Sequence, residues 1–439
     1  MLYIRSALAD LESHYNNVAE AMINDADWSM VIPGVKMGTE DEDQDPTAKA
    51  KVGILLVGGL RGSQPIGREL LLRFARHLGE GYKQGDNIVS MLLTVADIYI
   101  LPGVDMEGFT AAEEGQCRSD KRDEAGSMFK QSSNKATEAL KNFMSRFDIS
   151  LALSVESGGV FLRTPFDEVI NQEDSTDIDN VLIMMATVYG KNHPNINNNT
   201  NMCHDNLTGN VRGSSIKTRS YAGSFLDYSI IKHNIPAIAA HVSCCDFPRH
   251  KDIKKLYQDN LEPLKKFLSL SFQGLNDNYE LIINDMTEGV WGRVTDHKGH
   301  PLVNVSVNMG GLVRRTDHQG RYIAVYPVGE YKLEMTREGY KPLSTKFKVA
   351  PETMTRKDLV MDPVSLSLNY NSYDSIKTSL DSLVTQYPSN AVITDHQSME
   401  CIKISSDVQS DPRPGVSVVG WSNIGEEVAL NLAEYLVTR

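Results

Sequence analysis

A short polar loop, residues 61–65, carries the first side chains that could do chemistry. Arg61 is a permanently charged donor without a lone pair, and Gln64 is a neutral amide that both donates and accepts hydrogen bonds. The loop follows the continuous apolar run Ile54–Val57 and precedes a helix pattern with apolar residues at 66, 70, 71, 74 and 78. It therefore lies at the carboxyl end of a buried strand, where open α/β sheets place their ligands.

Two more polar side chains end or interrupt strand patterns. Glu156 follows residues 149–155, whose apolar side chains alternate with small or polar ones and predict a half-buried strand. His241 lies at an apolar run, Ile238–Val242. A further strand is expected at 98–102, and helices are expected at 1–30, 132–147 and 253–275. This order of strands and helices predicts that residues 1–288 form a mixed α/β sheet with helices on both faces.

The pattern changes at Gly289. From there to Pro363, short alternating runs are separated by turn signals about every ten residues. This spacing predicts a small all-β sandwich over residues 289–363. His297, His300 and His318 fall in its turns without a shared face, so we interpret them as solvated rather than as metal ligands.

An internal repeat marks residues 364–439. Ile424–Leu436 aligns with Ile66–Leu78, and Val416–Gly420 aligns with the strand pattern before that helix. We interpret residues 364–439 as the incomplete amino-terminal part of a second copy of the first domain. The chain is then expected to be a fragment of a longer tandem protein or the product of an incompletely defined gene.

Composition and charge narrow the class of protein. With 439 residues, 41% hydrophobic and 23% charged, the chain is ordinary for a globular protein of two or three domains. Its net charge of −13 argues against nucleic acid as a partner, and no run approaches the ~18 apolar residues of a membrane span. The five cysteines lack metal-ligand spacing and leave the disulfide pattern open. N-glycosylation triplets begin at Asn198, Asn206 and Asn304.

Several motifs resemble the N/E subfamily of zinc metallocarboxypeptidases, in particular its carboxypeptidase D group, in which such domains are repeated in tandem. The resemblance rests on Gly67–Leu72, Pro102–Phe109, Pro165–Asp167, Gly223–Tyr228 and Ser243–Pro248. The sandwich resembles the transthyretin-like domain that follows the catalytic domain in that subfamily. The resemblance implies a family zinc cofactor, a peptide or protein ligand, a secretory or extracellular location, and a parent protein that can be membrane-anchored.

The residues that the family uses for catalysis are replaced at the matching positions. The three zinc-ligand positions hold Arg61, Gln64 and Glu156, the general-base position holds His241, and the substrate-binding positions hold Gly126, Ser127 and Arg219. An arginine has no lone pair to give a metal, and an amide is a weak zinc donor. We therefore expect no cofactor in this chain.

These replacements favour a pseudoenzyme, similar to the inactive third domain of the carboxypeptidase D group, that binds a peptide or protein or spaces neighbouring domains. The alternatives are an active zinc carboxypeptidase that removes C-terminal basic residues, a different hydrolase using Glu156 and His241, and a purely structural spacer. In the degenerate site we expect the Arg61 guanidinium to pair with the Glu156 carboxylate, because a charge in a cleft needs a partner.

Overall fold

The computed structural model describes most of the chain and divides it into two compact units, Met1–Pro363 and Val364–Arg439. The described residues are 2–23, 31–40, 51–110, 112–117, 129, 135–166, 176–197, 203, 208–212, 224–271, 289–351, 354–364, 373–388, 391–396 and 399–404.

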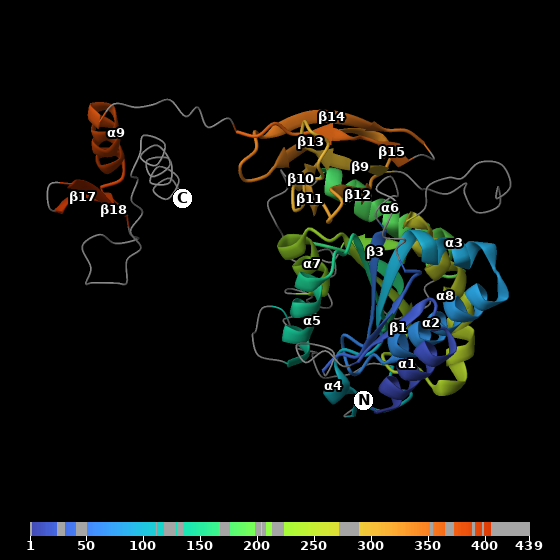
Figure 1. Cartoon of the computed structure of the whole chain (residues 1–439). Helices are drawn as coiled ribbons and strands as arrows, with labels where there is room; N and C mark the ends of the chain where they lie inside the picture. The colour runs from blue at the N-terminus through green and yellow to red at the C-terminus, as the bar shows by residue number, and fades with distance from the viewer. Residues whose placement is uncertain are drawn as a thin grey trace. The chain divides into compact units, whose positions relative to one another are not determined.

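The first unit is built on an eight-stranded mixed sheet (Figure 1). Its strands are β1 (Ala19–Met22), β2 (Gly34–Met37), β3 (Val52–Gly58), β4 (Ala96–Leu101), β5 (Leu151–Glu156), β6 (Gly159–Thr164), β7 (Asn210–Arg212) and β8 (Ala237–Ser243). Their order is β1-β2-β4-β3-β5-β8-β6-β7. The four central strands β4, β3, β5 and β8 are parallel, whereas β2 and β6 run antiparallel to their central neighbours. The carboxyl ends of β3, β5 and β8 therefore share one edge.

Helices cover both faces of this sheet, as the sequence predicts. They are α1 (Leu2–His14), α2 (Ile66–Gln84), α3 (Asn87–Val95), α4 (Met106–Thr110), α5 (Lys135–Arg146), α6 (Thr176–Asn192), α7 (Phe225–His233) and α8 (Ile253–Leu268), with 3-10 turns η4 (His250–Asp252) and η5 (Ser269–Ser271). Figure 1 shows α5 and α7 on one side and α1, α2, α3 and α8 on the other. Ile54 and Leu56 join the core on the α2 side, while Leu55 and Val57 join the core on the α5 side. The continuous apolar run in β3 is thus explained by burial on both faces.

A close backbone contact fixes the start of α2 against the sheet. A Cβ added at Gly67 would lie 2.2 Å from the carbonyl oxygen of Val155, the residue before the end of β5. No side chain fits there without movement of the backbone. The glycine therefore lets the loop 61–65 lie directly over the end of the neighbouring strand.

Two element predictions are corrected by the structure. Residues 1–30 do not form one helix: α1 ends at His14, and the chain returns as β1, which pairs with β2. Two asparagines, Asn16 and Asn17, stand at this reversal, and asparagine favours turns. The helix expected over 253–275 ends at Leu268 and continues as a 3-10 turn to Ser271, the last described residue before 289.

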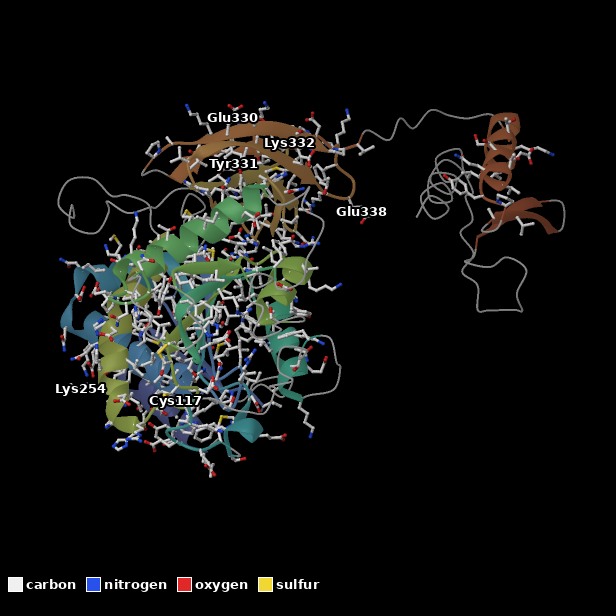
Figure 2. The ribbon with its side chains drawn as sticks, turned by 180° about the vertical axis from the view of Figure 1, so that it is seen from behind. Cys117, Lys254, Glu330, Tyr331, Lys332 and Glu338 are labelled. Atoms are coloured by element: carbon white, nitrogen blue, oxygen red, sulfur yellow. A yellow bond between two sulfur atoms is a disulfide. The ribbon has the colours of Figure 1, made fainter. Side chains whose placement is uncertain are left out.

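Residues 289–363 form the predicted all-β region. Its strands are β9 (Gly289–Thr295), β10 (Ser306–Met309), β11 (Leu312–Arg315), β12 (Arg321–Val325), β13 (Gly329–Thr336), β14 (Leu343–Val349), β15 (Met354–Arg356) and β16 (Leu359–Val360). One sheet has the order β11-β10-β13-β14, and the other is built around β9. Along β13, Tyr331 is buried while Glu330 and Lys332 are exposed (Figure 2). This alternation is what a sheet with one covered face requires.

One buried arginine ties the sandwich to the mixed sheet. The Arg314 guanidinium, on β11, donates to the carbonyl oxygens of Ser150 at 2.7 Å and Asn234 at 2.9 Å. Burial lowers the pKa of Arg314, and the charge of Asp148 opposes that shift. The two parts of the first unit therefore share a desolvated, hydrogen-bonded contact.

The second unit is described over α9 (Tyr373–Gln386), β17 (Ala391–His396) and β18 (Met399–Ile404). The two strands form an antiparallel pair. The repeated segments Val416–Gly420 and Ile424–Leu436 lie outside the described residues. The interpretation of residues 364–439 as an incomplete second copy therefore stays a prediction.

Candidate functional site

The candidate site lies at the edge shared by β3, β5 and β8, and Gln64 connects the segments that leave these strands. The Gln64 side chain is 2% exposed. Its Nε2 donates to Asp246 Oδ1, after β8, at 2.9 Å, and its Oε1 accepts from the backbone nitrogen of Ser157, after β5, at 3.4 Å. The Ser157 hydroxyl in turn donates to the Asp246 carbonyl oxygen. One amide thus links three loops, because it supplies both a donor and an acceptor.

Glu156, at the end of β5, is buried as an ion. It is 4% exposed, and its Oε1 accepts from the Ser154 hydroxyl at 2.8 Å and from Arg163 Nη2, on β6, at 3.3 Å. Burial alone would raise the pKa of Glu156. The neighbouring positive charges, of which Arg163 is the strongest, and the hydrogen bond from Ser154 outweigh burial and lower this pKa to about 2.

His241 is also buried, on β8 directly opposite Glu156 in the strand register. Its ring stacks on Phe161 with 4.3 Å between centroids, and its Nδ1 donates to the Ser157 carbonyl oxygen at 2.8 Å. Its Nε2 lies 3.8 Å from Glu156 Oε2. Burial lowers the pKa of His241 to about 4, although the Glu156 charge opposes this shift. The imidazole is therefore neutral near pH 7.

Arg61 lies in the loop after β3, and Asp105 fixes this loop. The Asp105 carboxylate accepts from the backbone nitrogens of Gly62 at 2.9 Å and Gly108 at 2.8 Å. Arg61 is close enough for its charge to lower the pKa of Glu156, but it contributes less than Arg163 does. The expected pairing of Glu156 with Arg61 is thus corrected: its hydrogen-bonded guanidinium is that of Arg163. We missed Arg163, although a charged residue inside the apolar run 160–166 signals a buried partner.

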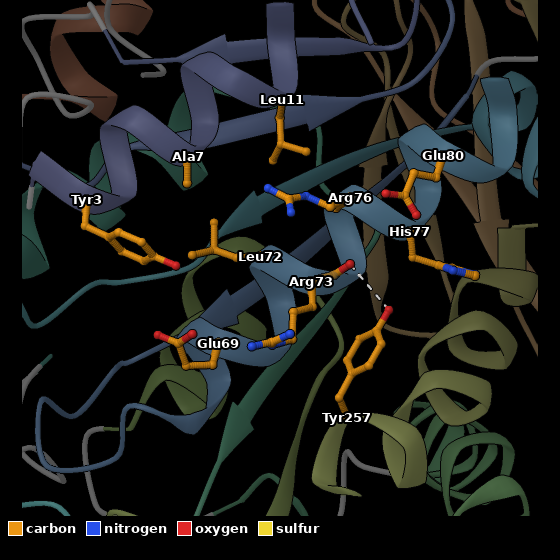
Figure 3. A pocket seen from close by; sticks show the side chains of 10 residues that line it. All are labelled: Tyr3, Ala7, Leu11, Glu69, Leu72, Arg73, Arg76, His77, Glu80 and Tyr257. Atoms are coloured by element: carbon orange, nitrogen blue, oxygen red, sulfur yellow. Dashed lines mark hydrogen bonds between the residues drawn. The ribbon is translucent and has the colours of Figure 1, made fainter. Parts of the chain in front are cut away.

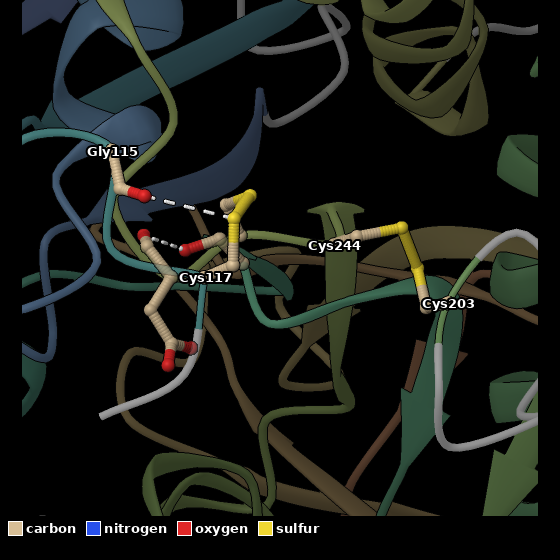
Figure 4. Close-up of a disulfide and its surroundings, with 7 residues drawn as sticks. Gly115, Cys117, Cys203 and Cys244 are labelled. Carbon is tan, nitrogen blue, oxygen red and sulfur yellow. Dashed lines mark hydrogen bonds between the residues drawn. A yellow bond between two sulfur atoms is a disulfide. The ribbon is translucent and has the colours of Figure 1, made fainter. Parts of the chain in front are cut away.

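Two disulfides reinforce the same edge (Figure 4). Cys117 pairs with Cys245, and Cys203 pairs with Cys244. The adjacent cysteines after β8 therefore hold two different loops, a pattern that the sequence left open. Disulfides between segments far apart in sequence chiefly restrict the unfolded chain.

Several predicted site residues lie outside the described part of the chain: Gly126, Ser127, Arg219, Asn198 and Asn206. Asn304 is described and exposed, and its Oδ1 accepts from Arg315 at 3.0 Å. Within the described ranges no group of three or more His, Cys, Asp or Glu side chains could hold a metal ion. Among the same residues, no helix is both long and apolar enough to span a membrane.

Comparison with known proteins matches both parts of the first unit. The zinc carboxypeptidase family model matches residues 31–127 and 111–263, and the carboxypeptidase regulatory-like domain matches residues 289–362.

Two relatives and one solved structure illustrate what the chain is similar to. Carboxypeptidase D of Rattus norvegicus is 25% identical over 347 residues, which cover 76% of this chain and 23% of that protein. Carboxypeptidase D of Drosophila melanogaster is 25% identical over 373 residues, which cover 83% of this chain and 24% of that protein. The crystal structure of thrombin activatable fibrinolysis inhibitor has a TM-score of 0.46 at 14% identity and covers 61% of this chain and 72% of that chain.

The chain spans about a quarter of the length of these curated relatives. The family match, in contrast, extends over more than half of the chain's own residues. The chain belongs to the zinc carboxypeptidase family.

Proposed function

We propose that this chain is a non-catalytic, carboxypeptidase D-like module that binds a peptide or protein, or spaces neighbouring domains, in a longer tandem protein. The observation that supports it is the state of Gln64 and Glu156, which stand at two positions where the family has zinc ligands. Both side chains are already committed to protein partners, Gln64 to Asp246 and Ser157 and Glu156 to Arg163.

The residues at this edge do not fit the family's zinc ion. A zinc site needs at least three protein donors with available lone pairs. Arg61 has none, and the amide of Gln64 is a weak donor already used in two hydrogen bonds. Glu156 could bind a metal only by giving up its contacts with Ser154 and Arg163. Metal binding would therefore have to displace a buried, fully engaged network.

His241, which stands at the family's general-base position, also supports a non-catalytic function. A general base must reach the proton that it removes and needs a pKa near the working pH. His241 is fully buried against Phe161, and its pKa is lowered to about 4. Such an imidazole stabilises the packing between β8 and β6 and is poorly suited to activate water.

The second candidate is an active zinc carboxypeptidase that removes C-terminal basic residues from peptides, and family membership favours it. The two functions differ in zinc content. We expect the purified chain, after dialysis against zinc at micromolar concentration, to hold no stoichiometric zinc by elemental analysis. We also expect no release of arginine from a peptide that ends in arginine. A tightly bound equivalent of zinc would reject the non-catalytic function.

A variant set sharpens this test. Arg61→His, Gln64→Glu and Glu156→His together restore the family's donors, so zinc binding should appear before any peptidase activity. The matched control replaces the same three residues with alanine, which removes the network but adds no donors. Zinc bound equally by both triple variants would place the ion elsewhere on the chain.

A secretory or extracellular location follows from the same proposal. Two disulfides are expected in an oxidising compartment, and Asn304 is exposed in a glycosylation triplet. Glycosidase treatment of the chain secreted from cultured cells should then lower its apparent mass.

A further inference from the structure

A groove of about 340 Å³ runs along α2, between α1 and α8 (Figure 3). It is lined by side chains from all three helices, among them Tyr3, Leu72, Arg73, Arg76, Glu80 and Tyr257. Neither Gln64 nor Glu156 lines it. The groove is thus a surface distinct from the candidate site at the sheet edge.

Two arginines in this groove lack protein partners among the residues that the structure describes. Arg73 and Arg76 are exposed and stand three residues apart on α2, so they share one face of the helix. Neither side chain makes an ion pair or hydrogen bond to another described residue. Like charges at this spacing destabilise a helix by a few tenths of a kcal/mol. The pair is therefore not explained by the stability of α2.

The carboxylates of the groove balance the two arginines only in part. Glu69 and Glu80 lie four residues from Arg73 and Arg76, a spacing that permits ion pairs on a helix. However, Glu69 bonds to Arg68 at 3.1 Å. Glu80 lies near Tyr15, and burial and then the charge of this carboxylate raise the pKa of the Tyr15 hydroxyl. Arg73 and Arg76 against the single charge of Glu80 therefore leave the groove lining net positive, on a chain whose net charge is −13.

The rest of the lining combines apolar and aromatic side chains with the imidazole of His77. Leu11 and Leu72 are buried at its floor, and Tyr3 is 65% exposed at its rim. Tyr257 forms another wall, and its hydroxyl donates to the Arg73 carbonyl oxygen at 3.3 Å. An apolar floor with a few fixed charges is suited to a ligand that combines carboxylates with an apolar side chain.

We infer that this groove binds an acidic peptide segment of a partner protein, with carboxylates that pair with Arg73 and Arg76 and an apolar side chain between them. A guanidinium meets a carboxylate in two parallel hydrogen bonds, which favours carboxylates as the charged groups. The buried leucines and the exposed tyrosine favour a peptide over a bare anion. This inference does not depend on whether the chain binds zinc, so the two proposals succeed or fail separately.

The probe is a fluorescein-labelled peptide, Glu-Leu-Glu-Tyr-Glu, titrated with the full chain by fluorescence anisotropy. Arg73→Gln and Arg76→Gln should each weaken binding about two- to fivefold, as expected for exposed ion pairs, and the double variant should weaken it by about tenfold. Glu80→Gln should strengthen binding, because it removes a repelling charge. Arg315→Gln, which removes an exposed arginine of the sandwich, is the matched control and should leave binding unchanged.

Three results would overturn the inference. The first is an unchanged affinity in the double variant while its circular dichroism shows a folded chain. The second is an equal loss in Arg315→Gln, which would indicate attraction without a site. The third is equal competition by inorganic phosphate or equal binding of the neutral peptide Gln-Leu-Gln-Tyr-Gln, because either would remove the requirement for an acidic peptide.

Discussion

The buried pair of Glu156 and Arg163 gives the sharpest prediction about stability. Arg163 and Glu156 are 2% and 4% exposed, so neither charge is solvated by bulk water. Glu156→Gln would keep the shape of the side chain but leave the Arg163 guanidinium buried without this carboxylate. Removing one partner of a buried ion pair typically destabilises a protein by about 3–5 kcal/mol.

The pKa of Glu156 gives a second estimate of the magnitude. Its fall from 4.5 to about 2 corresponds to roughly 3 kcal/mol in favour of the ionised form, at about 1.36 kcal/mol per pKa unit. We therefore expect Glu156→Gln to lower the free energy of unfolding at pH 7 by about 3 kcal/mol. Urea unfolding followed by far-ultraviolet circular dichroism measures this difference.

Two further variants test the physical reason. Glu156→Gln combined with Arg163→Met removes both charges, and it should recover most of the lost stability because the buried guanidinium is removed together with the carboxylate that balances it. Glu138→Gln breaks an exposed ion pair with Lys141, 2.8 Å long, and should change stability by less than about 1 kcal/mol. A loss below 1 kcal/mol in Glu156→Gln, or an equal loss in the double variant, would refute the reasoning.

Acid should destabilise the first unit in two steps, because both buried groups have pKa values below their ordinary ones. Because the pKa of His241 is lowered from 6.5 to about 4, the unfolded chain binds this proton first, and stability falls as the pH falls through that range. Glu156, whose pKa is lowered from 4.5 to about 2, has the same effect at lower pH. Urea midpoints from pH 7 to 3 should fall throughout, and His241→Gln should flatten the upper part; a flat wild-type profile would contradict both assignments. Arg314→Met should lower the free energy of unfolding by about 2–4 kcal/mol, because it leaves the carbonyls of Ser150 and Asn234 buried without donors. A matched change on the sandwich surface, Arg315→Met, should have little effect, and equal losses in both would argue against the buried contact.

The local spacing of apolar residues was sufficient to predict the elements in which that spacing is regular. The run Ile54–Val57 and the helix stripe from Ile66 predicted β3 and α2, because burial on two faces and on one face leaves different signatures. The alternation after Gly289 predicted the all-β region for the same reason. The prediction of one helix over residues 1–30 was wrong because the four-residue strand β1 is too short to show a period of its own. Its strand form depends on pairing with β2, which a local pattern does not contain.

Part of the candidate site followed from the sequence. Arg61, Gln64 and Glu156 were expected at the carboxyl ends of strands, and parallel pairing of β3 with β5 brings those ends together. Arg163 was not expected there, because it reaches Glu156 from β6, which is antiparallel to β8 and not adjacent to β5 in the sheet. Likewise, the sequence alone did not show that the Asp246 carboxylate accepts a hydrogen bond from the Gln64 amide. Tertiary pairing therefore decided which charges meet.

The kind of contact at this edge bears on how a metal site can be lost without loss of the fold. A metal ion has two structural effects in such a site. It balances the charge of carboxylate ligands, and it holds separate loops together. Here Arg163 supplies a positive charge beside Glu156, and Gln64 links the loops after β3, β5 and β8. If the chain is non-catalytic as proposed, replacing Gln64 with leucine should loosen these loops although no metal is involved. Faster amide exchange at Ser157 and Asp246 than in wild type, with the sandwich amides unchanged, would support this substitution of a hydrogen-bond network for an ion, and unchanged exchange at both residues would refute it.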